Sequence, residues 1–137
     1  MNESIEQTLS IVKPDAVERN LTEEIKSIFK KNNLIVKDEK KIHITRDEAA
    51  EFYKVHQSKP FYNDLCAYLS SGPIQVMILE GKNAVLLNRK IMGATNPKEA
   101  EKNTIRNLYG ISIDKNSVHG SDSPENAKKE INFFFKS

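Results

Sequence analysis

Cysteine and glycine are scarce in this chain, and long apolar runs are missing. Cys66 is the single cysteine, which excludes an internal disulfide and a cysteine metal cluster. The five glycines form neither a Gly-x-x-x-x-Gly-Lys-Ser/Thr nor a Gly-x-Gly-x-x-Gly pattern, so a P-loop and a Rossmann phosphate cradle are excluded. No apolar run approaches the roughly 20 residues that span a bilayer, and no signal-peptide pattern opens the chain. We therefore expect a cytoplasmic protein with no membrane partner.

The charge of the chain is nearly balanced, and arginine is rare. A formal net charge of +2 is too small to indicate a nucleic-acid footprint, so we expect no specific nucleic-acid partner. His43, His56 and His119 are too dispersed in the sequence for a zinc motif, and we expect the first two at the surface or at a boundary. Four of the 21 basic residues are arginines. Their positions are informative because arginine binds phosphate bidentately, which lysine cannot do.

Hydrophobic periodicity predicts one domain over residues 1–137 in which strands and helices alternate. We expect strands at 8–12, 34–44 and 74–80 and near His119, and helices over 22–31, after Thr45, after Pro60, over 83–92 and from Pro124. The order embeds a βαββαβ pattern. It predicts an α/β protein of the α+β sandwich type, with a ferredoxin-like four-stranded antiparallel sheet and helices packed on one side.

Three segments of this pattern have a more specific expectation. The charged middle of the second strand, 37–41, predicts an exposed edge or a bend. The most apolar strand, 74–80, is expected in the centre of the sheet. Residues 93–103 show no periodicity, and a loop of that length inside a compact domain is typically functional.

A short strand-like segment carries His119, and a helix start follows it closely. Ser123 is a typical N-cap and Pro124 a typical first helical residue, so we expect unpaired N–H groups there to attract anions. Gly120 is expected to leave room above the imidazole. Glu130, on the same helix, is placed to reach back to the histidine. The pattern predicts phosphoryl chemistry, although a strand-end histidine in a structural hydrogen bond explains it as well.

Other candidate side chains each have a structural interpretation when taken singly. Tyr53 and Phe61 are spaced like core aromatics on helices. Arg89 lies in the last turn of a helix, where it complements the helix dipole. Lys13 precedes Pro14 at a strand tip, which is compatible with a solvated position.

Five separated segments decide between these interpretations. They are Lys-Pro-Asp-Ala-Val at 13–17, Pro-Phe-Tyr-Asn-Asp-Leu at 60–65, Ser-Gly-Pro at 71–73, Asn-Arg-Lys-Ile-Met-Gly-Ala-Thr-Asn-Pro at 88–97 and Asn-Ser-Val-His-Gly-Ser-Asp-Ser at 116–123. In this order and spacing they resemble the nucleoside diphosphate kinase family, over about residues 6–135. The resemblance implies ping-pong transfer of the terminal phosphoryl group from a nucleoside triphosphate, typically ATP, to any nucleoside diphosphate through a phosphohistidine.

The same resemblance implies roles for the catalytic residues. His119 is the nucleophile through its δ nitrogen. Glu130 orients the ring through the other nitrogen, with Ser121 hydrogen-bonded alongside. The Tyr53 hydroxyl lies near the histidine and the transferred phosphate. Arg106 and Lys13 stabilise the charge of the phosphoryl group in flight.

Nucleotide contacts follow from the resemblance as well. Arg89, Thr95 and Arg106 bind the phosphates, and Lys13 and Asn116 reach the sugar hydroxyls. The base stacks on the aromatic ring of Phe61, and the aliphatic side chain of Ile113 lies on its opposite side. Because stacking accepts any π face, base tolerance is expected. Mg²⁺ is expected to be bound through the nucleotide phosphates with no protein ligand, and the chain to form a tetrameric or hexameric homo-oligomer.

Two alternatives from other functional classes remain. A catalytically silent ferredoxin-like module for nucleotides or nucleic acid is disfavoured because His119, Lys13 and Arg106 are all present and the aromatic strand signature of an RRM is not. A phosphohistidine relay protein would not need Phe61 as a base-stacking residue.

Overall fold

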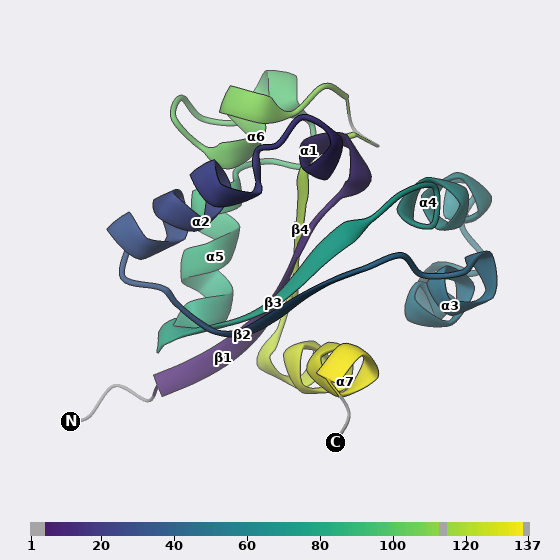
Figure 1. The fold of residues 1–137 in the computed structure, drawn as a ribbon, viewed down its shortest axis with the longest axis horizontal. Helices are drawn as coiled ribbons and strands as arrows, with labels where there is room; N and C mark the ends of the chain where they lie inside the picture. The colour runs from purple at the N-terminus through teal and green to yellow at the C-terminus, as the bar shows by residue number, and fades with distance from the viewer. Residues whose placement is uncertain (1–4, 113–114, 136–137) are drawn as a thin grey trace.

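A four-stranded antiparallel sheet is the centre of the computed structural model, which describes residues 5–112 and 115–135. Its strands are β1 (Ile5–Val12), β2 (Ile35–Ile42), β3 (Ile74–Lys82) and β4 (Val118–Gly120). They lie in the order β2-β3-β1-β4, and each neighbouring pair is antiparallel. The predicted ferredoxin-like α+β architecture is confirmed, with β3 inside the sheet as expected (Figure 1).

Helices connect the strands, and their ends follow local sequence signals. The described helices are α1 (Pro14–Glu18), α2 (Thr22–Lys31), α3 (Arg46–Phe52), η1 (Lys54–His56), α4 (Tyr62–Leu69), α5 (Ala84–Met92), η2 (Pro97–Glu99), α6 (Ile105–Tyr109) and α7 (Pro124–Phe135). Thr45 and Glu48 form the capping box at the start of α3, with both reciprocal hydrogen bonds present. The sequence pattern did not predict α1, although Pro14 occupies the first-turn position that proline tolerates.

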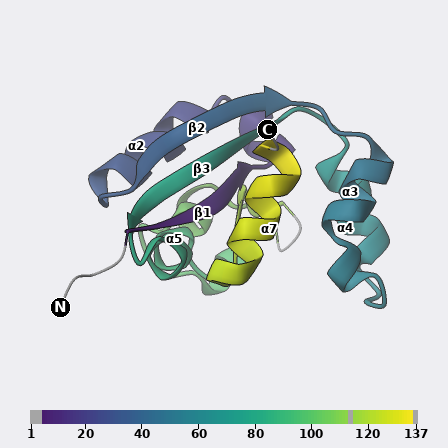
Figure 2. The same ribbon diagram turned by 90° about the horizontal axis from the view of Figure 1, so that it is seen from below.

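Helices cover both faces of the sheet, so the expectation of helices on one side is wrong (Figures 1 and 2). One core contains side chains from α2, α5 and α6, and a second contains side chains from α3, α4 and α7. The reason is visible in β3. Met77 and Leu79 point into the first core, whereas Ile74 and Val76 point into the second. A strand that is apolar on both faces must be covered on both.

The edge strand β2 has the exposed character that its charged middle predicts. It pairs with β3 alone within the described residues, and its register shifts between Val36 and Asp38, as at a β-bulge. Ile35, at its start, is 60% exposed. None of the helices in the described ranges has the length and apolar character needed to cross a bilayer.

The opposite edge of the sheet positions the histidine. In β4, His119 pairs with Ile11 and Val118 pairs with Val12 of the central strand β1. Since β1 leads directly into Lys13, the pairing of β1 with β4 brings the lysine and the histidine close together from positions that are distant in the chain.

Candidate active site

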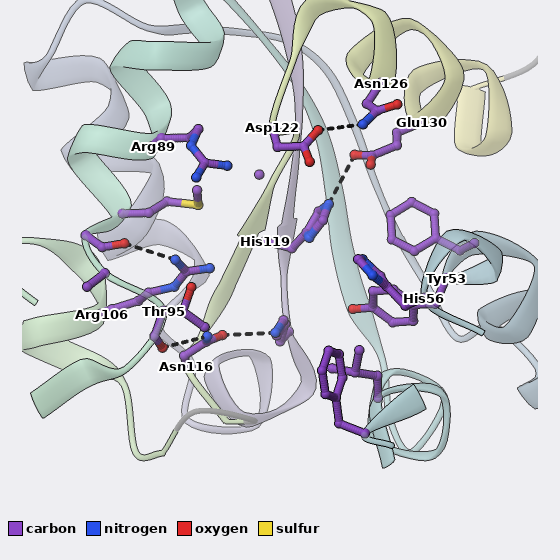
Figure 3. A pocket seen from close by; sticks show the side chains of 18 of the residues that line it. Tyr53, His56, Arg89, Thr95, Arg106, Asn116, His119, Asp122, Asn126 and Glu130 are labelled. Carbon is purple, nitrogen blue, oxygen red and sulfur yellow. Dashed lines mark hydrogen bonds and ion pairs between the residues drawn. The ribbon is translucent and has the colours of Figure 1, made fainter. Parts of the chain in front are cut away.

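A cavity of about 1180 Å³ lies beside β4, between α3 and α4 on one side and the end of α5 with residues 93–106 on the other. The loop predicted to be functional therefore forms one of its walls. Figure 3 shows His119 between the two arginines and the side chains of Tyr53 and His56. The predicted site residues that line the cavity are Lys13, Tyr53, Phe61, Arg89, Thr95, Arg106, Asn116, His119 and Glu130.

Of the predicted site residues that the structure describes, Ser121 is not among the lining side chains, because it is fully buried. The prediction for Ile113 falls outside the described residues.

His119 is held by one nitrogen, which leaves the other for chemistry. Its Nε2 lies 3.1 Å from Glu130 Oε1. Because a carboxylate oxygen only accepts hydrogen bonds, Nε2 carries a proton, and in the neutral ring Nδ1 therefore has the lone pair. Ser121 Oγ donates to the same oxygen at 2.8 Å and accepts from Leu9 N at 3.3 Å, so the carboxylate is tied to β1. The imidazole is thus oriented by a charged partner that is itself fixed.

Aromatic rings fix the imidazole from the side of α3. The Phe52 ring meets it edge-on at 5.3 Å between centroids, and the Tyr53 ring does so at 6.5 Å. Tyr53 is buried and packs in the core, as its helical spacing predicts, and it also lines the cavity; its catalytic role stays a prediction. Burial, followed by the nearby Glu130 charge, raises the pKa of Tyr53, so its hydroxyl keeps its proton and remains a donor.

Gly120 was expected to leave room above the His119 imidazole, but the structure gives another reason for a glycine at this position. A Cβ at this position would lie 2.4 Å from Asn88 Nδ2 and 2.7 Å from Met92 Cε. Both atoms belong to α5, so the glycine lets this helix approach β4 closely and does not reserve space above the imidazole. The consequence for the site is that the end of α5, which carries Arg89, lies directly against the strand of His119.

The start of α7 is capped as predicted, but it presents a carboxylate to the cavity. Ser123 Oγ accepts a hydrogen bond from Asn126 N at 3.1 Å. Asp122, which lines the cavity, accepts from Asn126 Nδ2 at 2.6 Å. An anion at this helix end would meet the Asp122 charge, so the expected anion attraction has to come from the opposite wall.

That opposite wall is cationic. Arg106 is largely buried, and its two Nη atoms donate to Gly93 O at 3.0 Å and to Val118 O at 2.9 Å. Burial, followed by the charge of Arg89, lowers the pKa of Arg106 to about 10, so the guanidinium stays charged at neutral pH. Arg89 is exposed on the last turn of α5. The two groups give the wall a buried inner cation that is hydrogen-bonded to the backbone and an exposed outer one.

Lys13 is buried, so the solvated interpretation of this residue is wrong. It is 5% exposed, and its Nζ donates to Asn116 Oδ1 at 2.9 Å. The Asn116 amide in turn donates from Nδ2 to Thr95 O at 3.0 Å, a bond visible in Figure 3. The three predicted residues therefore form one hydrogen-bonded chain at the cavity.

The wall formed by η1 and α4 carries the aromatic groups. Phe61 is 43% exposed, which is unusual for so large an apolar ring and rules out the core interpretation. Lys59 Nζ lies 5.7 Å from its centroid. His56, expected at a boundary, lies 6.2 Å from both Phe61 and Tyr53 between ring centroids. Burial, followed by the Lys59 charge, lowers the pKa of His56 and keeps its ring neutral.

Sequence reasoning missed several residues of this cavity. Phe52 and His56 line it next to Tyr53, and Asp122 lies three residues from the histidine. The position of His56 between Tyr53 and Phe61 was the available signal. His43, by contrast, is exposed as predicted and bonds from Nε2 to Ser70 O at 2.8 Å.

The chain is similar to known proteins over nearly its whole length. The family model described as "Nucleoside diphosphate kinase" matches residues 6–137. A nucleoside diphosphate kinase of a Nitratiruptor species is 55% identical, and one of Helicobacter hepaticus is 56% identical, each over 131 residues that cover 96% of both chains. The solved Aquifex aeolicus nucleoside diphosphate kinase superposes with a TM-score of 0.95 at 41% identity, covering 98% of this chain and 97% of that one.

Proposed function

The chain belongs to the nucleoside diphosphate kinase family, and we propose that His119 Nδ1 carries its phosphoryl group between nucleotides. The protein is a phosphotransferase that moves a terminal phosphoryl group from a nucleoside triphosphate to a nucleoside diphosphate. One observation above all supports the assignment of His119: Glu130 occupies Nε2, so Nδ1 is the nitrogen with a lone pair at the cavity.

Two displacements at phosphorus complete a cycle. In the first, the Nδ1 lone pair forms the N–P bond while the bond to the bridging oxygen breaks, and the nucleoside diphosphate leaves with that electron pair. In the second, a terminal phosphate oxygen of the incoming diphosphate attacks phosphorus and the N–P electrons return to Nδ1. Glu130 accepts the hydrogen bond from Nε2–H throughout and stabilises the positive charge that develops on the ring. Ser121 holds that carboxylate in place.

Charge stabilisation of the transferred group is assigned to the cationic wall. A phosphoryl group in flight spreads its charge over the equatorial oxygens, and catalysis consists mainly of positioning and electrostatics. Arg106 is suited to this task because two backbone carbonyls fix its guanidinium. Lys13 lines the same cavity, and Tyr53 adds a hydroxyl donor. Arg89 and Thr95, both exposed at the cavity, are assigned to the leaving diphosphate.

The sugar and the base are assigned to the two remaining walls. Lys13 and Asn116 form a linked donor pair, which is suited to sugar hydroxyls. The exposed ring of Phe61 is suited to stacking a base, and Ile113 is retained opposite it from the family resemblance. Stacking reads no hydrogen-bond pattern, so this arrangement supports tolerance of different bases.

Magnesium is assigned to the nucleotide and not to a protein cage. Within residues 5–112 and 115–135 no group of three or more His, Cys, Asp or Glu side chains could hold a metal ion. This set of residues fits an ion that keeps phosphate oxygens and waters as its ligands. Asp122 is the cavity carboxylate best placed to accept a hydrogen bond from such a water, because its neighbour Asn126 already orients it. When bound, the ion neutralises phosphate charge.

The proposal also includes a homo-oligomeric state and a cytoplasmic location. The exposed edge strand β2, with Ile35 largely exposed, supports a contact between copies in a tetrameric or hexameric homo-oligomer. The single cysteine, Cys66, is a buried free thiol, which supports a cytoplasmic location.

Labelling with ATP that carries radioactive phosphorus in its terminal phosphate tests the function directly. We expect one label per chain that is lost in acid and survives alkali, as for a phosphorus–nitrogen bond on histidine. Adding GDP, CDP or UDP should then discharge it, because the second step runs through the same bond. A label that survives acid would place the chemistry on a hydroxyl, and a chain that takes no label would match the silent binding module.

Truncation of Phe61 to alanine tests the base wall. We expect the affinity for every nucleoside diphosphate to fall by about 5- to 150-fold, because stacking on an aromatic ring contributes about 1–3 kcal/mol per base. The fall should be similar for purines and pyrimidines. Binding is measured by calorimetry, with the matched variant Phe135→Ala as control, since that ring packs at the Lys40 side of α7 and does not line the cavity. A loss restricted to one base would contradict a stacking role.

A further inference from the structure

Behind the sugar side of the cavity lies a buried carboxylate, Asp15, that has no part in the chemistry described so far. Its side chain is 4% exposed. The Tyr68 hydroxyl donates to Oδ1, and Ser117 Oγ and Arg19 Nη2 donate to Oδ2 at 3.1 Å each. Tyr68 also accepts a hydrogen bond from the Asp15 backbone N–H at 2.8 Å. Asp15, Arg19, Tyr68 and Ser117 are all absent from the cavity lining, so a nucleotide would not contact them.

Ser117 is held in a strained backbone turn. Its φ is +76°, in the left-handed region that residues other than glycine rarely adopt. Val118 N donates to Asn116 O at 2.9 Å, which closes a γ-turn of the rare positive-φ kind around Ser117. Two bonds oppose this strain: Lys13 N donates to Ser117 O at 2.8 Å, and Ser117 Oγ donates to Asp15.

This turn determines where three site residues point. Asn116 precedes the strained residue and Val118-His119 follow it, while Lys13 is bonded to it through the backbone. Relaxation of the turn to an ordinary φ would rotate the Asn116 side chain away from Lys13 Nζ. A strained residue next to a site persists only where its surroundings over-determine it, and here the Asp15 carboxylate supplies that constraint.

The carboxylate also ties together separate walls of the cavity. Tyr68 belongs to α4, which follows Phe61 in the chain. Arg19 donates from Nη2 to Tyr109 O at 2.6 Å, at the end of the helix that carries Arg106. Burial, followed by the hydrogen bond to Asp15, raises the pKa of Tyr68, so this hydroxyl stays a donor to the carboxylate. The Asp15 carboxylate thus connects three parts of the cavity: the wall with Phe61, the wall with Arg106 and the end of β1 that leads into Lys13.

We propose that Asp15, with Tyr68 as its donor, is a positioning residue that holds the strained Ser117 turn and thereby sets Lys13 and Asn116 for the sugar hydroxyls. The proposal rests on the function assigned to His119 above. It makes the Tyr68–Asp15 pair a determinant of sugar recognition that acts without touching the nucleotide.

The test compares Tyr68→Phe with the wild type in single-turnover labelling of His119 by ATP and by 2′,3′-dideoxyATP. We expect the variant to lose about tenfold in second-order rate constant with ATP, the order expected for one hydrogen bond to a buried charge. With dideoxyATP, which lacks the hydroxyls that Lys13 and Asn116 are positioned to bind, the rate constant should fall clearly less than with ATP, because only the contribution of Lys13 to the phosphoryl group is then disturbed. Tyr62→Phe is the matched control, because that α4 tyrosine donates to Ala50 O instead.

If Tyr68→Phe lost the same factor in rate constant with ATP and with dideoxyATP, the Tyr68–Asp15 pair would have only a general structural role and the proposal would be overturned. A variant that lost no rate with either nucleotide would overturn it as well. A second pair of variants avoids dependence on one side chain. Ser117→Gly accepts a positive φ without strain, whereas Ser117→Ala keeps the strain and loses the bond to Asp15. The preference for ATP should fall in the order wild type, glycine variant, alanine variant, and an alanine variant equal to wild type would overturn the proposal. If the wild type itself takes no label, the assigned function has failed instead.

Discussion

Replacement of His119 by alanine is expected to abolish labelling by ATP and to lower phosphoryl transfer by about 10⁴-fold or more, the scale of loss when a covalent nucleophile is removed. Without Nδ1 the two nucleotides would have to react directly, and the cavity would need to hold both at once. The measurement is steady-state transfer from ATP to GDP together with single-turnover labelling. Nucleotide affinity should change little, because the ring binds the group in flight and not the base or the sugar.

The fold should tolerate this change, which keeps the result interpretable. His119 is partly exposed, and its removal leaves Glu130 bonded to Ser121. Circular dichroism and thermal unfolding would verify this. His43→Ala serves as the matched control, because that histidine is exposed on another part of the surface. Labelling that persists in His119→Ala but disappears in another histidine variant would assign the nucleophile elsewhere.

Apart from α1, the order of the main strands and helices could be predicted because each signal is local. The capping box at Thr45 and Glu48 and the charged middle of β2 depend on residues within one element. The cover on both faces of the sheet was missed, although β3 is apolar at alternate positions on either side. Which helix covers which face is decided by long-range packing, and that information is spread across the chain.

Within the site, the predictable part was again the local one. Glu130 follows His119 by 11 residues across one capped turn, and the contact could be anticipated from that spacing. The burial of Lys13 could not, because its partner Asn116 lies 103 residues away. Gly120 shows the same limit, since the atoms that require it belong to α5 and come from a different part of the chain.

Replacement of Arg106 by alanine is expected to slow the labelling of His119 by about 10²- to 10³-fold, the loss typical when a fixed transition-state donor is removed. The guanidinium binds Gly93 O and Val118 O with one hydrogen bond each and has further N–H groups for a phosphate oxygen. Such a donor is pre-organised before the substrate arrives. We therefore expect kcat and kcat/KM to fall together, as they do when an interaction made mainly in the transition state is lost.

Stability has to be separated from rate in this variant. The substitution removes the donor from Val118 O, in a buried hydrogen bond, and from Gly93 O, in a part-buried one. A buried carbonyl without its donor costs about 1–3 kcal/mol in the free energy of unfolding. Urea unfolding measures this contribution, and the rate is then compared at a temperature where the variant is fully folded. Arg46→Ala is the matched control, because Arg46 is exposed at the start of α3, away from the cavity lining.

Arg106→Lys separates charge from geometry. An ammonium group keeps the positive charge but cannot bind two backbone carbonyls and a phosphate oxygen in one plane. If the transition state is stabilised by the fixed planar guanidinium, Arg106→Lys should be more stable than Arg106→Ala. Its rate should nevertheless remain about 10²-fold below that of the wild type. A lysine variant with the full wild-type rate would show that charge alone suffices. A folded alanine variant with an unchanged rate would remove Arg106 from the phosphoryl site and transfer its role to Lys13 and Arg89, which line the same cavity.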